Sequence, residues 1–249
     1  MKIGFTSTTF RGIKDVDKVI EIGKAAKVDC IEWGGDIHVK DTEKAVYVKK
    51  QCSNQGIGIS SYGSYYVVGS NDNEYWERIS KIAAAMGAET VRVWLGKKDS
   101  EKTDDRSYEN IVNDAKAMCA VAANYGLTVA PECHARTYNN ETQAFLKIRK
   151  DIGCENFMTY FQSRYRRKEY DLDRIEQTID FIKNVHLSYS EQTREQLLKI
   201  DTKYIDTLID KLKAKHFDGT VLLEYTYFGS PKYCVKDIHK LRTKLGEKS

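Results

Sequence analysis

Short β-rich runs alternate with amphipathic helical stretches along the whole chain, and this alternation restricts the possible folds more than any other feature. Eight runs rich in apolar and β-branched residues are each followed by a stretch of helical periodicity; the runs are 3–7, 28–33, 57–62, 90–95, 127–131, 156–161, 184–188 and 219–225. Strands separated by helices are expected to lie parallel and to be joined by right-handed crossovers. The alternation therefore predicts an α/β fold with a parallel sheet.

The intervening stretches each carry a single apolar stripe, which is typical of helices that cover a sheet. In one of them, Leu172, Ile175, Ile179 and Ile182 recur at intervals of three or four residues. The first helix is expected around 16–21, and the others at 42–54, 74–86, 105–125, 141–150, 172–182, 204–215 and 235–245.

The length of the chain favours a closed barrel over an open sheet. Eight strand-helix units in 249 residues average about 31 residues each, a size that suits a (β/α)₈ TIM barrel. A doubly wound open sheet would usually carry a G-x-G-x-x-G phosphate loop after its first strand, where this chain has Ser7-Thr8-Thr9-Phe10-Arg11-Gly12. We predict a single parallel eight-stranded barrel that occupies residues 1–249 as one domain.

Composition restricts the partners and the location. The 40 basic and 36 acidic residues leave a net charge of +4, which argues against a dedicated nucleic-acid-binding protein. No apolar run approaches the ~18 residues of a membrane span, the N-terminal residues lack the apolar core of a signal peptide, and the six cysteines include no Cys-x-x-Cys pair. We expect a cytoplasmic protein with a small-molecule substrate and no nucleic-acid or membrane partner; a homo-oligomer remains open.

Four residues of metal-ligand type fall at the ends of predicted strands five to eight. These are Glu132, Gln162, His186 and Glu224, at spacings of 30, 24 and 38 residues that each suit one strand-helix unit. Functional groups of such barrels project from the C-terminal strand ends. Two carboxylates, an amide oxygen and an imidazole suit one divalent ion such as Mn²⁺, Co²⁺, Mg²⁺ or Zn²⁺. Any one of them alone would more often be a hydrogen-bonded residue of the rim.

Other polar and aromatic residues near strand ends are candidates for the substrate pocket. They are Glu32, Trp33, His38, Tyr62, Trp94, His134, Arg136 and Arg164. Glu32 and His38 would complete the rim, whereas the aromatic residues are as suited to packing as to forming substrate walls. Arg164 belongs to a basic run at 164–168, which is either a solvated loop or an anion site.

Four short motifs carry a resemblance to a known family. They are Ile31-Glu32-Trp33-Gly34-Gly35-Asp36-Ile37-His38, Ala130-Pro131-Glu132-Cys133-His134, Asn184-Val185-His186-Leu187 and Leu222-Leu223-Glu224-Tyr225. Together they resemble the xylose isomerase-like TIM-barrel superfamily, which includes sugar isomerases, epimerases and inosose-processing enzymes. The resemblance implies a metal held by Glu132, Gln162, His186 and Glu224; most members have Asp where this chain has Gln162, so its site has one negative charge less.

The resemblance also implies a reaction, namely proton abstraction beside a carbonyl through an enediolate, as in aldose-ketose isomerases and ketose epimerases. Glu132 and Glu224 would be the catalytic base and acid, while His134 and Arg136 would orient hydroxyl groups. A metal-dependent lyase, such as a dehydratase of inososes or an enzyme that cleaves keto-glycosides, begins with the same proton loss. A sugar-binding protein without activity is a further alternative. An abasic-site endonuclease is disfavoured, because five histidines in these positions do not assemble a three-zinc cluster.

Overall fold

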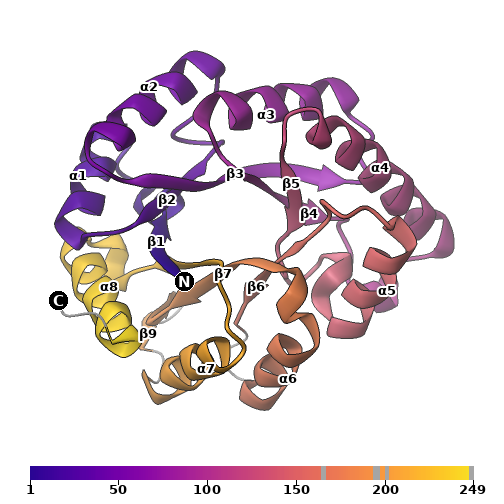
Figure 1. Ribbon diagram of the computed structural model, residues 1–249. Helices are drawn as coiled ribbons and strands as arrows, with labels where there is room; N and C mark the ends of the chain where they lie inside the picture. The colour runs from indigo at the N-terminus through magenta and orange to yellow at the C-terminus, as the bar shows by residue number, and fades with distance from the viewer. Residues whose placement is uncertain (164–166, 193–196, 200–201, 247–249) are drawn as a thin grey trace.

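The central strands are the short buried runs expected from the sequence. The computed structural model describes residues 1–163, 167–192, 197–199 and 202–246. Eight parallel strands form one sheet: β1 (Lys2–Thr6), β2 (Cys30–Gly34), β3 (Gly58–Val68), β4 (Thr90–Leu95), β5 (Thr128–Pro131), β6 (Thr159–Gln162), β7 (Ile182–Ser188) and β10 (Thr220–Tyr225). Figure 1 looks along the axis around which these strands are arranged.

The sheet curls into a barrel whose closure is uneven. The strand order is β5-β4-β3-β2-β1-β10-β7-β6, with parallel pairing between neighbours. Its two edges, β5 and β6, meet through the isolated bridges Val129↔Phe157 and Glu132↔Tyr160. The protein is therefore a single (β/α)₈ TIM barrel, as predicted, with a seam between β5 and β6.

Helices surround the barrel on all sides in Figure 1. They are α1 (Val16–Ala26), α2 (Thr42–Asn54), α3 (Asn73–Met86), α4 (Asp105–Ala123), α5 (Thr142–Ile152), α6 (Lys168–Thr178), α7 (Thr202–Ala214) and α8 (Pro231–Leu245). The carboxylates of Asp15, Asp41, Asp72 and Asp104 accept backbone N–H groups at the starts of the first four. These caps satisfy donors that a helix cannot pair internally and fix where each helix begins.

Two apolar regions follow from the alternation of side chains along the strands. The larger packs the outer strand faces against the helices and includes Ile31, Trp33, Trp76 and Phe145. The smaller lies inside the barrel and consists of Cys30, Ala130, Tyr160 and Leu222. Residues two positions after these four are therefore directed toward the same interior, closer to the C-terminal strand ends.

Three segments differ from the predicted elements. Strand β3 continues beyond Tyr62 to Val68. Helix α6 ends at Thr178 because Ile179 begins a 3-10 turn, η4 (Ile179–Phe181), and Ile182 begins β7. The same apolar spacing is compatible with a turn followed by a strand.

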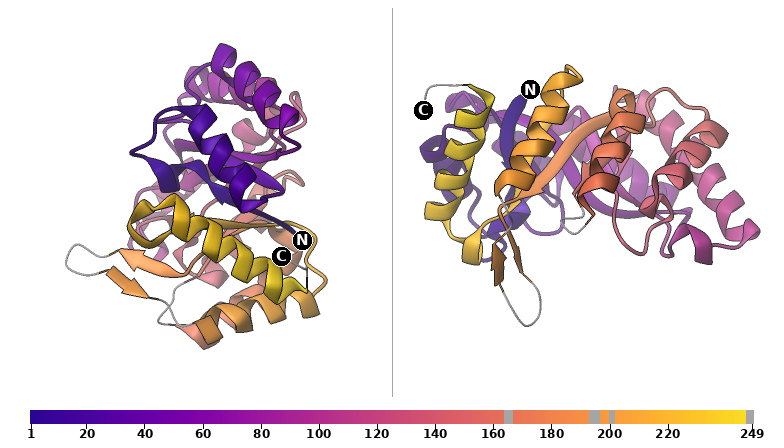
Figure 2. Two further views of the ribbon diagram at one scale, coloured as in Figure 1. Left: turned by 90° about the vertical axis from the view of Figure 1, so that its left-hand side faces the viewer. Right: turned by 90° about the horizontal axis from the view of Figure 1, so that it is seen from below.

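The third difference is an antiparallel pair, β8 (Ser190–Gln192) with β9 (Leu197–Lys199), which the sequence pattern did not indicate. Figure 2 shows this pair projecting beyond the barrel at the end opposite the N-terminus. None of the described helices combines the length and the apolar content that a membrane crossing requires.

Candidate functional site

The strand alternation brings the four predicted ligands together at the C-terminal end of the barrel. Ala130, Tyr160 and Leu222 of the inner core precede Glu132, Gln162 and Glu224 by two residues, so the later residues face the same interior. His186 lies on β7, whose residues Val185 and Leu187 pack in the outer core. Four neighbouring strand ends thus direct polar side chains toward one point.

Three of these residues form a compact cluster of ligand atoms. One atom each from Glu132, His186 and Glu224 lies within 4.8 Å of the others. His186 Nδ1 is 3.4 Å from Glu132 Oε1 and 3.8 Å from Glu224 Oε1. Two carboxylates and an imidazole at this separation suit a divalent cation, because the cation offsets the cost of burying two like charges.

Buried polar atoms without hydrogen-bond partners support this assignment. Both ring nitrogens of His186 lack a partner, and so does Gln162 Oε1. Gln162 Nε2 donates to Glu224 Oε2 at 2.8 Å, so the amide turns its free oxygen away from that contact. Buried acceptors are rarely left unpaired in native proteins. A cation would use the lone pairs of His186 Nδ1 and Gln162 Oε1, which lie on the side of Glu132 and Glu224, and the residues present therefore fit a divalent metal site.

Arg92 on β4 links this cluster to a further buried carboxylate. Its Nη1 donates to Glu132 Oε2, and its Nε donates to Glu32 Oε1 at 3.2 Å. A Cβ at Gly63 would lie 3.0 Å from Arg92 Nη2, so glycine at this position of β3 leaves room for the guanidinium group. The ion pairs keep the buried carboxylates of Glu32 and Glu132 and the partly exposed Glu224 around one arginine and one histidine.

The electrostatic environment separates the two carboxylates of the cluster. Burial alone would raise the pKa of Glu132, but Arg92 and His186 outweigh burial and hold that pKa well below its usual range. Burial raises the pKa of Glu224, and the nearby Glu132 adds to the effect although His186 opposes it. Glu132 therefore stays ionised, whereas Glu224 holds a proton more readily.

His186 and Glu32 respond to each other and to the surrounding charges. Burial would lower the pKa of His186, yet Glu32 and Glu224 raise it to about 10. Burial would likewise raise the pKa of Glu32, but His186 and Arg92 lower it to about 2. Because the cluster is rich in negative charge, it attracts either a proton or a metal ion to the imidazole.

Aromatic side chains form a partly exposed wall beside Glu132. Trp94 Nε1 donates to Glu132 Oε2 at 3.2 Å, and the indole stacks on His134 at 5.7 Å between ring centroids. Tyr65 contacts Trp94 edge to face at 5.6 Å between ring centroids. Aromatic side chains of this kind suit contact with the apolar face of a sugar ring. Trp94 and His134 were candidates from the sequence, whereas Tyr65 was not.

Trp33, His38 and Tyr62 do not lie at the mouth of the barrel. Trp33 follows Glu32 on β2 and therefore faces the helices, where it is fully buried. His38 packs edge to face on Trp33, and its ring nitrogens contact Ser7 Oγ and the Ile13 carbonyl. The Tyr62 hydroxyl donates to the Val39 carbonyl. These three side chains pack in the outer layer, between the strands and the surrounding helices and loops.

The remaining candidates have separate locations. Glu32 is 0% exposed and lies beneath the mouth, inside the barrel, and not on the rim. Arg136 is exposed on the loop after β5, where its backbone N–H donates to Asp99 Oδ1 at 2.6 Å and its φ of 64° is in the left-handed region. Arg164 lies outside the described residues.

Sequence reasoning missed the polar residues that support the cluster from below. Tyr160 and Asn184 precede Gln162 and His186 by two residues, and Ser61 pairs with Glu32 across β2 and β3. Arg92, which lies in the predicted strand at 90–95, was not among the candidates. Counting two residues back from each candidate ligand would have identified Tyr160 and Asn184, because strand side chains on one face repeat every two residues.

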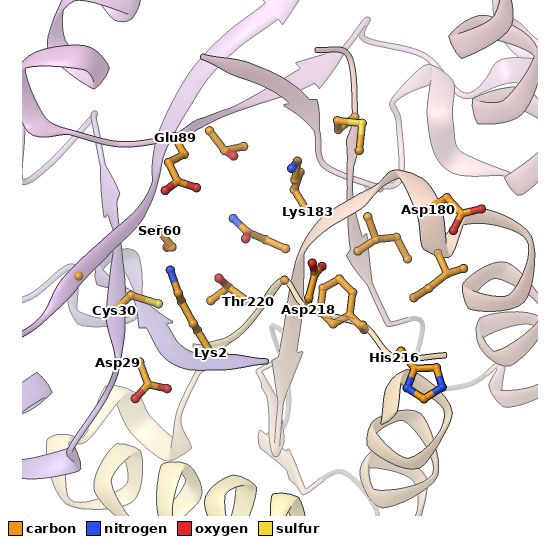
Figure 3. Close-up of a pocket in the computed structure, with 18 of the residues that line it drawn as sticks. Lys2, Asp29, Cys30, Ser60, Glu89, Asp180, Lys183, His216, Asp218 and Thr220 are labelled. Carbon is orange, nitrogen blue, oxygen red and sulfur yellow. The ribbon is translucent and has the colours of Figure 1, made fainter. Parts of the chain in front are cut away.

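A cavity of about 580 Å³ opens at the opposite end of the barrel. Lys2, Glu89, Lys183 and Asp218 bring both signs of charge to its lining (Figure 3). Another lining residue, Asp29, accepts from the Ile3 N–H at 2.7 Å and from Arg242 Nη2 at 2.7 Å. Conventional pairing of this kind indicates a structural role, and the N-terminal face of such barrels usually serves stability.

Comparisons with solved structures give the same fold at low sequence identity. The probable 3-DHS dehydratase AsbF from Bacillus anthracis has a TM-score of 0.82 at 15% identity, with 97% of this chain and 98% of that chain covered. A D-psicose 3-epimerase, crystallised in the presence of D-fructose, has a TM-score of 0.79 at 14% identity, with 99% and 100% covered. The 3-keto-D-glucoside 4-epimerase YcjR from E. coli has 0.75 at 18%, with 98% and 99% covered.

The sequence itself gives one family and no individual relative. No curated protein sequence matches the chain. The family model described as xylose isomerase-like TIM barrel matches residues 20–244, which include all four predicted ligands. Since this match covers most of the chain and agrees with the observed barrel, the chain belongs to the xylose isomerase-like TIM-barrel family.

Proposed function

We propose that this protein is a divalent-metal-dependent enzyme that moves a proton beside a carbonyl group of a sugar or polyol, as an isomerase or epimerase does. The observation that carries the proposal is the buried cluster of Glu132, His186 and Glu224, with ligand atoms within 4.8 Å and ring nitrogens without hydrogen-bond partners. Gln162 is the fourth ligand through its free Oε1. The kinship with structures of two sugar epimerases supports a polyhydroxylated substrate.

The bound metal would supply Lewis-acid stabilisation of the negative charge that develops on the substrate oxygen. The chain itself supplies the proton transfer. Glu224 has a raised pKa and a side chain that is 13% exposed, so it can reach a substrate and exchange a proton with it. Glu132 stays ionised beside Arg92 and would serve the opposite face of the reacting carbon in an epimerase.

The aromatic wall of Tyr65, Trp94 and His134 would orient the substrate above the cluster. Its edge-to-face and stacked contacts hold the rings in place before a substrate arrives, which reduces the ordering cost of binding. Trp94 also hydrogen-bonds Glu132, so the wall and the carboxylate are positioned together. Arg136, on the exposed loop after β5, would contact the distal hydroxyl groups.

A lyase is the second candidate, and one comparison favours it. The structure with a TM-score of 0.82 is a probable dehydratase of the same fold. Removal of a proton beside a carbonyl can be followed by loss of a β-hydroxyl group as water, or by return of the proton. The first steps are the same, so the fate of the β-substituent decides between the two reactions.

The test is metal analysis of the purified protein, followed by assays before and after complete chelation. Ketoses, 3-keto-glycosides and inososes are tested as substrates in D₂O, and the masses of the products are measured by mass spectrometry. We expect one bound divalent ion per chain and metal-dependent solvent deuterium at the reacting carbon with no change in skeleton. Loss of 18 mass units or of an aglycone would identify the lyase. Deuterium exchange that survives full metal removal would contradict the proposal.

A further inference from the structure

A polar column lies inside the barrel directly beneath the ligand cluster. It consists of Glu32, Ser61, Tyr160 and Asn184, each at most 4% exposed. Tyr160 OH donates to Glu32 Oε2 at 2.8 Å, and Ser61 Oγ donates to the same oxygen at 2.8 Å. Asn184 Nδ2 in turn donates to Tyr160 OH at 2.7 Å and to Ser61 Oγ at 3.2 Å. The four side chains form one connected network.

An irregularity of β3 builds this column. The pairing of β2 with β3 matches Ile31 with Ile59 and Glu32 with Ser61, so Ser60 is an extra residue at a bulge. Bulges redirect side chains within a strand. Here Ser60 Oγ lies 3.2 Å from Ser61 Oγ, and Ser60 lines the cavity at the other end of the barrel (Figure 3). The bulge therefore places Ser61 opposite Glu32 on the neighbouring strand, where its hydroxyl reaches the carboxylate.

The carboxylate of Glu32 is fixed by this arrangement. Its Oε2 accepts two hydroxyl groups, while its Oε1 accepts Arg92 Nε at 3.2 Å. Because both oxygens are already engaged and the side chain is 0% exposed, Glu32 is a poor candidate for a metal ligand or a substrate contact. One further contact of Glu32 is with His186, because its Oε1 lies 3.4 Å from His186 Nε2.

The two ring nitrogens of His186 face different groups. Nδ1 faces the ligand cluster, 3.4 Å from Glu132 Oε1 and 3.8 Å from Glu224 Oε1. Nε2 lies 3.4 Å from Glu32 Oε1, on the opposite edge of the ring. Tyr160 packs edge to face on the imidazole at 5.0 Å between centroids, so the residue that holds Glu32 also restricts the ring.

We propose that Glu32 is a positioning residue that keeps the proton of His186 on Nε2 and so presents the Nδ1 lone pair to the divalent ion. The inference rests on the proposed function and deepens it. Histidines that bind metals usually donate their other N–H to a carboxylate or carbonyl, which fixes the ring and its tautomer. Tyr160 and Ser61 act one step further away, by holding the Glu32 carboxylate against the ring.

The direct test is the ¹⁵N spectrum of the histidine side chains in the otherwise unmodified protein, loaded with Zn²⁺ alone. The His186 signals are assigned by their loss in His186→Gln. We expect the proton on Nε2 and the metal-induced shift on Nδ1. A metal-induced shift on Nε2 would overturn the role of Glu32 while leaving the metal site intact. Absence of any Zn²⁺ binding would overturn the proposed function and this inference with it.

Matched variants test whether Glu32 acts through His186 or through general stability. Glu32→Gln should weaken Zn²⁺ binding about 10-fold to 100-fold, the range for residues that orient a ligand. Tyr160→Phe keeps the ring and the carboxylate but removes one donor, so it should weaken binding about 3-fold to 10-fold. Both variants should also shift the His186 tautomer populations toward the Nδ1 proton.

The control variants remove a similar tyrosine–carboxylate hydrogen bond elsewhere in the protein. Tyr66 OH donates to the buried carboxylate of Asp114 in the outer layer, at 3.4 Å to Oδ2. Tyr66→Phe and Asp114→Asn should lower Tm but leave the Zn²⁺ affinity within about 2-fold, since they do not touch the column. Equal losses of affinity in the controls, or an unchanged affinity in Glu32→Gln, would refute the role. If Glu32→Gln does not fold, Tyr160→Phe and the tautomer measurement still decide.

Discussion

The two ends of the barrel both carry charged side chains, but the burial and the pairing of these side chains differ. At the N-terminal end, the cavity is large and its Asp29 is paired with Arg242 and a backbone N–H. At the C-terminal end, Glu32, Arg92, Glu132 and His186 are almost fully buried, and the histidine nitrogens have no hydrogen-bond partner. The comparison teaches that several buried charges gathered around one imidazole, more than the size of a cavity, indicate a candidate functional site.

Exchanging carboxylates for amides at the two ends should give the largest contrast. Glu132→Gln and Glu224→Gln should lower kcat/KM about 10⁴-fold and weaken metal binding, because each replaces a charged ligand by a neutral amide and removes a proton-transfer group. Glu89→Gln and Asp218→Asn, at the N-terminal cavity, are the matched controls and should remain within about 2-fold. Metal content and proton exchange with D₂O measure both sets. Comparable losses at the two ends would remove the distinction.

Two tryptophans allow the outer face of the barrel wall to be compared with the region beside Glu132. Trp33→Ala should lower the free energy of unfolding by about 3–5 kcal/mol, since its fully buried indole packs between strand and helix. Trp94→Ala should cost about 1 kcal/mol or less but raise KM, because Trp94 is partly exposed beside Glu132. Urea unfolding and steady-state kinetics separate the two effects. A raised KM with intact stability in Trp33→Ala would contradict the placement.

The pH dependence of metal binding should give a smaller, graded effect. The pKa of His186 is raised to about 10, so the imidazole is protonated at neutral pH and must lose a proton to bind a cation. Lower pH favours the protonated form, and the apparent affinity for Mn²⁺ should therefore rise about 10-fold per pH unit between pH 6 and 8. Calorimetric titration at constant ionic strength measures it. An affinity that does not change with pH would conflict with this origin.

Much of the fold and part of the site could be predicted, for an identifiable reason. Glu132, His186 and Glu224 were predicted because ligand-type residues recur at corresponding strand ends. The strand end does not say which face a residue occupies, so Glu32 and Trp33 were given the same role although adjacent residues point to opposite sides. Tyr160 was missed because its contact with Glu32 joins strands that are far apart in sequence, and Asn184 because it lies two residues before the strand position that was considered. The bulge at Ser60 has no sequence pattern of its own.

The seam between β5 and β6 would give a metal ion at the proposed site a mechanical effect on the barrel. The two strands meet through isolated bridges, one of which joins Glu132 to Tyr160, and Glu132 and Gln162 stand on either side. A cation held by both residues would link β5 to β6, the neighbouring strands that are joined only by isolated bridges in the described part of the chain. Its binding free energy would then add to the resistance of that junction to opening. The ion would thus stabilise the closed barrel as well as assist the reaction. Slower hydrogen exchange of the backbone amides of β5 and β6 in the metal-bound protein would show this stabilisation.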